Sequence, residues 1–280
     1  MLSHCIRKIV PVAYLSLFIS SVVSLTHAAP QDFVVVYDIT ATFIVNQQTI
    51  RKEVPGMVNG AFYALSKWTS KPAEAIEQDF RTLLASLGKQ QGATEMLVRD
   101  PEGRIVSELL SQWLSGAQSA SNLVQCIKNY AEYDIFKDIA KTIFNDGVIA
   151  RHTNAAPGIT ACIEQSEQLA GPNRLYLIGN WDPGSFILLA RMPQHQTIFS
   201  RIPAPNCLVS GLTRLLMPRN ADLLFNRIAT QAQVPLDHII FVSNMPYHIS
   251  AAQRIGVKTV SFASNNPNLA VQSITAILKS

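Results

Sequence analysis

The sequence predicts an α/β fold: a doubly wound parallel sheet with an inserted helical block. Short, almost wholly apolar runs recur along the chain, separated by amphipathic helical patterns. This alternation is typical of parallel strands that are buried on both faces and joined by crossover helices. A long stretch of helical periodicity, at about 45–155, falls between the first strand and the second. We therefore expect an α/β core formed by residues 29–44 and 156–280, interrupted by a helical cap at 45–155.

The first 28 residues have the pattern of a secretory signal peptide. Arg7 and Lys8 precede an apolar stretch over 9–25, and small residues follow it up to a predicted cleavage site after Ala28. An uncleaved anchor is the alternative, because the apolar stretch approaches the length that a bilayer requires. Pro11 and the serines within the stretch favour cleavage. We expect an exported protein, periplasmic or secreted, that contacts a membrane only if this segment is retained.

Charge and cysteine content exclude two classes of protein. The chain has a formal net charge of +4, to which the signal peptide contributes Arg7 and Lys8, and the remaining charges are evenly spread. This pattern does not favour nucleic acid as a partner. Cys126, Cys162 and Cys207 have spacings that match neither a disulfide framework nor a zinc site. One pair of these cysteines can form a disulfide in an oxidising compartment, and three buried thiols are the alternative.

The first strand ends on an acidic residue. The apolar run Phe33–Tyr37 leads directly into Asp38. In open α/β sheets, ligands bind beyond the carboxyl ends of the strands. Asp38 is therefore the first candidate for a catalytic residue.

Helical periodicity follows Asp38. Apolar residues recur at three- and four-residue spacing over 57–69 and 74–87, and further helical stretches cover 104–115 and 119–145. We interpret the large apolar side chains of this region as the core of a helical subdomain. The rest of the chain alternates again, with strands expected at 174–180, 198–202, 207–209, 238–244 and 258–262 and helices at 159–170, 185–192, 220–233 and 249–255.

The residues at the strand ends resemble the motifs of the haloacid dehalogenase (HAD) superfamily, over essentially the whole mature chain. The first motif is Asp38-Ile39-Thr40-Ala41-Thr42, and Gly179-Asn180-Trp181-Asp182 with Phe186 resembles a stretch found in dehalogenase-type members. Ser210-Gly211 and Met217-Pro218 stand where the family has Ser-Gly and Lys-Pro. Phe241-Val242-Ser243-Asn244 aligns with the fourth motif. The resemblance implies a HAD-like core with a helical cap.

The resemblance also implies roles for particular residues. Asp38 takes the position of the covalent nucleophile, and Thr40 that of the acid–base residue two positions later. The remaining motif positions line the substrate pocket of the family; here they are Thr42, Gly179, Asn180, Met217, Ser243 and Asn244. A small anionic ligand in the cleft between core and cap is the partner that this arrangement implies.

The departures from the family pattern concern the chemistry. Thr40 is not a carboxylic acid, Gly179 lacks the hydroxyl of the family's Ser or Thr, and Met217 lacks the lysine ammonium. Ser243 and Asn244 replace the acidic pair that holds magnesium in phosphatases. We expect a protein without the standard magnesium-dependent phosphatase activity. No cofactor is expected, and magnesium would be required only by a phosphatase.

Three alternatives remain open. An active hydrolase can use Asp38 as nucleophile if Arg214 or Arg219 replaces the missing lysine, although both are expected to face solvent. Ser243-Asn244 fits a dehalogenase, which also needs an arginine from the cap. Arg51 is a candidate for that arginine. A protein-interaction role for the helical insert has no repeat, heptad or basic stripe in its favour. His248 is expected at the start of a helix rather than as a base.

Overall fold

The structure is a computed structural model that describes residues 33–55, 57–67 and 72–279, so the expected signal peptide lies outside the described residues. A parallel sheet of five strands forms the core, in the order β5-β4-β1-β6-β7. The strands are β1 (Val34–Asp38), β4 (Leu175–Gly179), β5 (Cys207–Val209), β6 (Ile239–Ser243) and β7 (Lys258–Ser261). The α/β fold with a helical insert is confirmed.

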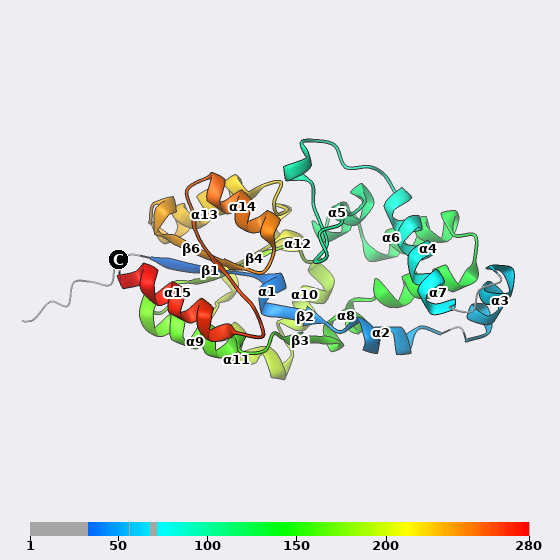
Figure 1. Cartoon of the computed structure of the whole chain (residues 1–280), viewed down its shortest axis with the longest axis horizontal. Helices are drawn as coiled ribbons and strands as arrows, with labels where there is room; N and C mark the ends of the chain where they lie inside the picture. Colours follow the sequence, from blue (N-terminus) through cyan, green and yellow to red (C-terminus); the bar gives the residue numbers. More distant parts are fainter. Residues whose placement is uncertain (1–32, 56, 68–71, 280) are drawn as a thin grey trace, which may run out of the picture.

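Helices cover both faces of the sheet (Figure 1). On one face lie α9 (Ile159–Ala170), α11 (Gln196–Phe199) and α15 (Pro267–Lys279). On the other lie α13 (Ala221–Ala232) and α14 (Pro246–Arg254). The central position of β1 explains its continuous apolar run, because successive side chains point to opposite faces of the sheet and both faces are buried. Val35 and Tyr37 join one buried cluster, and Val34 and Val36 join the other.

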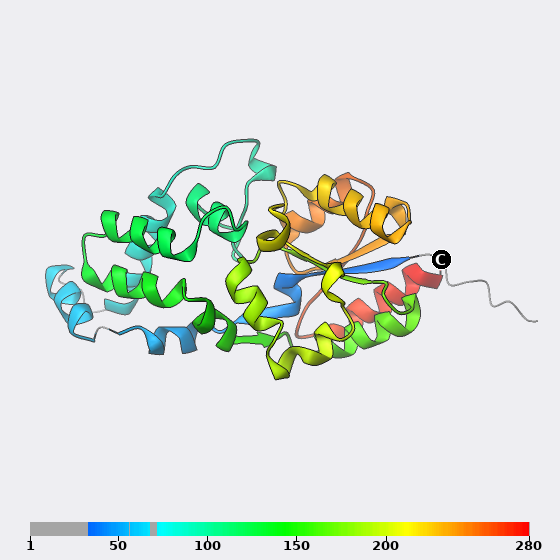
Figure 2. The ribbon, with the colours of Figure 1, turned by 180° about the vertical axis from the view of Figure 1, so that it is seen from behind.

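The helical insert extends from one end of the core (Figure 2). Its helices are α2 (Gln47–Glu53), α3 (Met57–Lys67), α4 (Pro72–Ser86), α5 (Glu108–Leu114), α6 (Ala120–Tyr130), α7 (Asp134–Ile143) and α8 (Asp146–Arg151). An antiparallel ribbon of β2 (Phe43–Val45) and β3 (Thr153–Ala155) joins insert and core. The insert has a hydrophobic cluster of its own, around Tyr63, Leu123, Ile127 and Ala140.

One segment differs from the sequence prediction. The expected strand at 198–202 is not extended, since Ile198 lies in α11 and Ile202 in the turn that follows it. The two isoleucines are four residues apart, which is helical spacing, and both are buried in the cluster on the same face of the sheet. Proline residues at 203 and 205 then separate this segment from β5.

Short helices connect the strand ends to the rest of the core. These are α1 (Ile39–Thr42), α10 (Pro183–Leu189) and α12 (Ser210–Thr213). Each begins immediately or shortly beyond the carboxyl end of a parallel strand, so the edge that carries Asp38 also carries these turns. In the part of the chain that the structure describes, no helix is both long and apolar enough to cross a membrane.

Candidate functional site

Asp38 lies at the carboxyl edge of the sheet, between the ends of β4 and β6. It is the last residue of β1 and the N-cap of α1, and its side chain accepts a hydrogen bond from the Thr40 backbone N–H. Aspartate is favoured at this position because its carboxylate satisfies a backbone donor that the helix leaves free. The side chain has 0 % exposure to solvent.

Both oxygens of the Asp38 carboxylate accept hydrogen bonds from the chain itself. Oδ1 lies 3.1 Å from Thr40 N and 2.9 Å from Thr40 Oγ1. Oδ2 lies 2.7 Å from Ser243 Oγ and 2.6 Å from His248 Nδ1. These donors come from α1, the end of β6 and α14, so one carboxylate connects three elements. We call Asp38, Thr40, Ser243 and His248 the Asp38 network.

Charge in this network determines the ionisation of Asp38. Burial by itself raises the pKa of a carboxyl group, because it penalises the charged form. Here the charge of His248 opposes burial, together with hydrogen bonds from His248, Ser243 and the Thr40 backbone, and the pKa of Asp38 falls below its ordinary value. The network therefore holds an ionised carboxylate in the interior.

His248 is the residue that sequence reasoning missed. It does lie in the first turn of α14, as expected, but its side chain is buried and bonded to Asp38. The buried face of that helix contains Ala251 and Ala252, and a histidine three and four positions before them was the available signal. Among the described residues, its Nε2 has no hydrogen-bond partner although it is buried.

Thr40 and Asn244 close the outer side of the Asp38 network. Thr40 Oγ1 lies 2.9 Å from both Asp38 Oδ1 and Asn244 Oδ1, so its single proton is shared between two acceptors. Asn244 Nδ2 donates to the Thr40 carbonyl at 3.1 Å. Thr40 is half-buried and Asn244 is exposed, so this pair faces solvent at the sheet edge.

Gly179, at the end of β4, adjoins the carboxylate from the other side. Its φ of 126° lies in a region that residues other than glycine rarely adopt. A Cβ atom built there would lie 2.8 Å from Asp38 Oδ1 and 2.8 Å from Ile39 Cγ2. Asp38 and Ile39 thus occupy the space that a serine or threonine side chain would need.

Asn180 and Met217 are paired through the backbone of Met217. The Asn180 amide donates to the Met217 carbonyl at 2.7 Å and accepts from the Met217 N–H at 2.8 Å. The Met217 side chain is fully buried in the hydrophobic cluster under α13 and α14. Asn180 therefore anchors the loop after α12, and Met217 contributes to the core.

Thr42, Arg219 and Arg51 have side-chain partners away from the Asp38 carboxylate. Thr42 Oγ1 donates to the Asp38 backbone carbonyl at 2.9 Å, within the turn of α1. Arg219 contacts Gln90 at 2.9 Å and Glu108 at 3.1 Å, both in the insert. Arg214 is exposed, and Arg51 pairs with Glu77 on α4. Among the described residues, none of these three arginines contacts Asp38.

Comparisons with known proteins identify solved structures that are similar to this chain. No family model matches the sequence, and no curated protein matches it. A HAD family enzyme from Bacteroides thetaiotaomicron is 11 % identical over 83 % of this chain and 94 % of its own, with a TM-score of 0.50. Its magnesium complex is 10 % identical over 83 % and 93 %, also with a TM-score of 0.50. A predicted HAD-like hydrolase from Porphyromonas gingivalis is 15 % identical over 88 % and 97 %, with a TM-score of 0.48.

The chain has the HAD fold.

At this HAD-fold site, the described side chains supply few of the oxygen ligands that magnesium prefers. Magnesium requires octahedral oxygen coordination and is usually held by one or two carboxylates. The site offers one carboxylate, and both of its oxygens already accept hydrogen bonds. The other side chains beside it are hydroxyls, an amide and an imidazole. Across the described residues, no group of three or more His, Cys, Asp or Glu side chains could hold a metal ion.

The arrangement limits what the site can do chemically. A carboxylate nucleophile needs an oxygen lone pair directed at the substrate and a nearby group that neutralises developing charge. In this HAD fold Asp38 Oδ2 is bonded to the buried Ser243 and His248, and Oδ1 to Thr40 on the outer side of the network. His248 Nδ1 lies beside Asp38, and it bonds to the same oxygen as Ser243.

Proposed function

We propose that this HAD-fold protein binds a ligand at the junction of core and cap and does not hydrolyse phosphate esters by the magnesium-dependent route. The observation that carries the absence of hydrolysis is the Asp38 network. Its carboxylate is fully buried and holds donors on both oxygens, so its role is to connect β1, β6 and α14.

Replacement of the supporting groups favours the same conclusion. Loss of a single preorganised electrostatic group commonly costs about 2.7–4 kcal/mol of transition-state stabilisation. Here Gly179 lacks a hydroxyl and Met217 lacks an ammonium group. Neither missing group is easily restored by substitution, since Asp38 fills the space beside Gly179 and the Met217 side chain is part of the core.

A phosphatase assay tests the proposal. The purified protein is incubated with p-nitrophenyl phosphate, with and without magnesium, beside Asp38→Asn and the control Asp222→Asn, which changes an exposed aspartate of α13. We expect no phosphate release above the blank from any of the three. Turnover by the wild type and by Asp222→Asn that is abolished in Asp38→Asn would overturn the proposal.

An active hydrolase with altered supporting residues is the second candidate. It is favoured by one contact: His248 lies 2.6 Å from Asp38 and can supply positive charge where Met217 cannot. In this mechanism Asp38 attacks the substrate and forms a covalent intermediate. Mass spectrometry of the Asp38 peptide, after incubation with anionic and halogenated substrates, tests it. An adduct on Asp38 supports this candidate, and no adduct or product across the panel rejects it.

Export is part of the proposal. It is supported by the basic start, the apolar stretch over 9–25 and the small residues up to Ala28. Mass spectrometry of the protein recovered from a bacterial periplasm gives the N-terminal residue directly. A chain beginning after residue 28 supports export with cleavage. An intact N-terminus in the membrane fraction would support the uncleaved anchor.

A further inference from the structure

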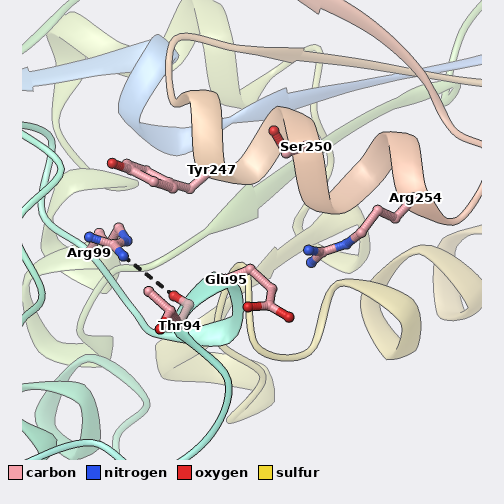
Figure 3. A pocket seen from close by; sticks show the side chains of 6 residues that line it. All are labelled: Thr94, Glu95, Arg99, Tyr247, Ser250 and Arg254. Atoms are coloured by element: carbon pink, nitrogen blue, oxygen red, sulfur yellow. Dashed lines mark hydrogen bonds between the residues drawn. The ribbon is translucent and has the colours of Figure 1, made fainter.

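A cavity of about 290 Å³ lies between the insert and the core, and Asp38 is not among its lining residues. The insert contributes the 3-10 helix η1 (Thr94–Met96) and the loop after it; the core contributes the outer face of α14 (Figure 3). The lining side chains are Thr94, Glu95, Arg99, Tyr247, Ser250 and Arg254. The volume is close to the lower end of the range for small-molecule sites, about 300 Å³.

Arg99 is held in a fixed position at one side of this cavity. Its Nη1 donates to the Gly103 carbonyl at 2.8 Å, and its Nη2 contacts the Thr94 carbonyl at 3.4 Å. The guanidinium carbon lies 4.3 Å from the centre of the Tyr247 ring. Its Nε is buried and has no hydrogen-bond partner among the described residues. The insert thus presents a preorganised cation that no carboxylate of the described chain neutralises.

Arg254 approaches from the opposite side of the cavity (Figure 3). Its Nη2 lies 3.6 Å from the Met96 sulfur, a weak acceptor, and it forms no ion pair within the described part of the chain. By contrast, other arginines of the chain pair with carboxylates, namely Arg51, Arg81, Arg104, Arg151, Arg201 and Arg219. Glu95 also lines this cavity, but among the described residues it forms no ion pair with Arg99 or Arg254.

We propose that this cavity binds a small organic molecule through its phosphate or carboxylate group. The inference rests on the proposed ligand-binding function and names the place and the class of ligand. Guanidinium groups bind these oxyanions with charge-assisted hydrogen bonds, and hydroxyls such as those of Ser250 and Tyr247 can add further donors. Glu95 opposes a second anionic group and can accept a hydrogen bond from a ligand hydroxyl or ammonium group.

The ligand would contact both parts of the molecule at once. Arg99 comes from the insert, whereas Tyr247, Ser250 and Arg254 come from α14 of the core. The same helix presents His248 to Asp38 on its inner face. Binding would therefore strengthen the contact between insert and core beside the Asp38 network.

Isothermal titration calorimetry with inorganic phosphate and with malonate, at constant ionic strength adjusted with chloride, tests the site and distinguishes the two oxyanion groups. We expect saturable binding of at least one probe. Arg254→Gln should weaken it about tenfold or more, since a charge-assisted hydrogen bond is lost. Arg227→Gln, an exposed arginine on the neighbouring helix α13, should leave it unchanged. Glu95→Gln should tighten binding, because it removes a like charge.

Two results would overturn the inference: no saturable binding of either probe, or binding that Arg254→Gln and Arg99→Lys both leave unchanged. The second variant retains the charge but loses the planar fork, so it tests Arg99 without removing the cation next to Tyr247. Hydrolysis is measured separately by phosphate release. If phosphate is released and the probes still bind, only the proposed absence of hydrolysis is rejected. If no phosphate is released and neither probe binds, only the proposed binding site is rejected.

Discussion

At the residue scale, Gly179 and Asp38 depend on each other for their positions. The positive φ of Gly179 favours a residue without a side chain, and a Cβ at this position would come within 2.8 Å of Asp38 Oδ1. A glycine in a motif can be taken from the sequence as a missing hydroxyl. That the neighbouring Asp38 carboxylate fills the space left by the missing side chain is visible only in the tertiary structure.

We therefore predict that Gly179→Ser, which restores the hydroxyl, destabilises the protein. A residue forced into a sparsely populated backbone region costs about 1–3 kcal/mol, and the contact with Asp38 adds to that cost. Denaturant unfolding measures the change in the free energy of unfolding. Gly60→Ser is the matched control, because a Cβ at Gly60 meets nothing within 4 Å. A stable Gly179→Ser protein would show that Asp38 can move aside.

At the element scale, Ser210 joins the core to the insert. It begins α12 directly after β5, and its hydroxyl donates to the Leu114 carbonyl at 2.7 Å, at the end of α5. The same oxygen accepts from the Trp181 backbone N–H at 2.9 Å. The sequence shows the Ser-Gly pair as a motif, but it does not show the contact with α5, because the two partners are 96 residues apart.

Ser210→Ala should loosen this junction. The substitution leaves a buried N–H and a carbonyl without their partner, which costs about 1–3 kcal/mol. Hydrogen exchange of the amides in α5 (Glu108–Leu114) should accelerate more than exchange in β1. Ser273→Ala, which removes a hydroxyl bonded only within the turns of α15, is the control and should change little. Equal exchange rates in α5 for Ser210→Ala and wild type would contradict the prediction.

At the scale of the whole molecule, the hydrophobic clusters of the sheet and of the insert meet at one side chain. Trp113 packs against the cluster of the sheet and also against the cluster of the insert. The Ser210–Leu114 hydrogen bond and the Arg219–Glu108 pair also join the core to the insert. The Arg219–Glu108 pair is partly exposed, so we expect about 0–1 kcal/mol from it. The buried contacts contribute more to this boundary.

The stability of the whole protein should depend on Asp38 in acid. Because its pKa is lowered from the usual 3.8 in the folded state, the unfolded chain takes up the proton first as pH falls. The stabilisation is therefore complete above about pH 5 and is lost as the pH falls below 3.8 through the folded-state pKa.

Asp38→Asn removes this titration. Its free energy of unfolding should be lower than that of the wild type at neutral pH, and the difference should shrink in acid. Urea unfolding between pH 3 and pH 7 measures both, with Asp222→Asn as the control at an exposed carboxyl. A difference that stays constant across this range would show that the carboxylate charge of Asp38 does not stabilise the fold.

The sequence by itself determined the architecture. The runs at β1, β4 and β6 are apolar because both faces of a parallel sheet are buried, and a local pattern of that kind is visible without coordinates. It also predicted that Asp38 ends the first strand, as the structure shows, whereas the site roles assigned to Asp38 and its neighbours stay predictions. The prediction for the segment with Ile198 was wrong, because a short apolar run next to prolines fits a strand or a turn of helix.

Only the tertiary structure decided what surrounds Asp38. His248 and Ser243 bond to its carboxylate although they lie more than 200 positions further along the chain, and Arg219 pairs with Glu108 in the insert. Arg99 and Arg254 likewise meet at one cavity from different parts of the chain. Strand and helix patterns follow from local spacing, whereas hydrogen bonds and ion pairs between distant residues follow from how the elements pack. The fold was therefore predictable from the sequence, and the chemistry of its site was not.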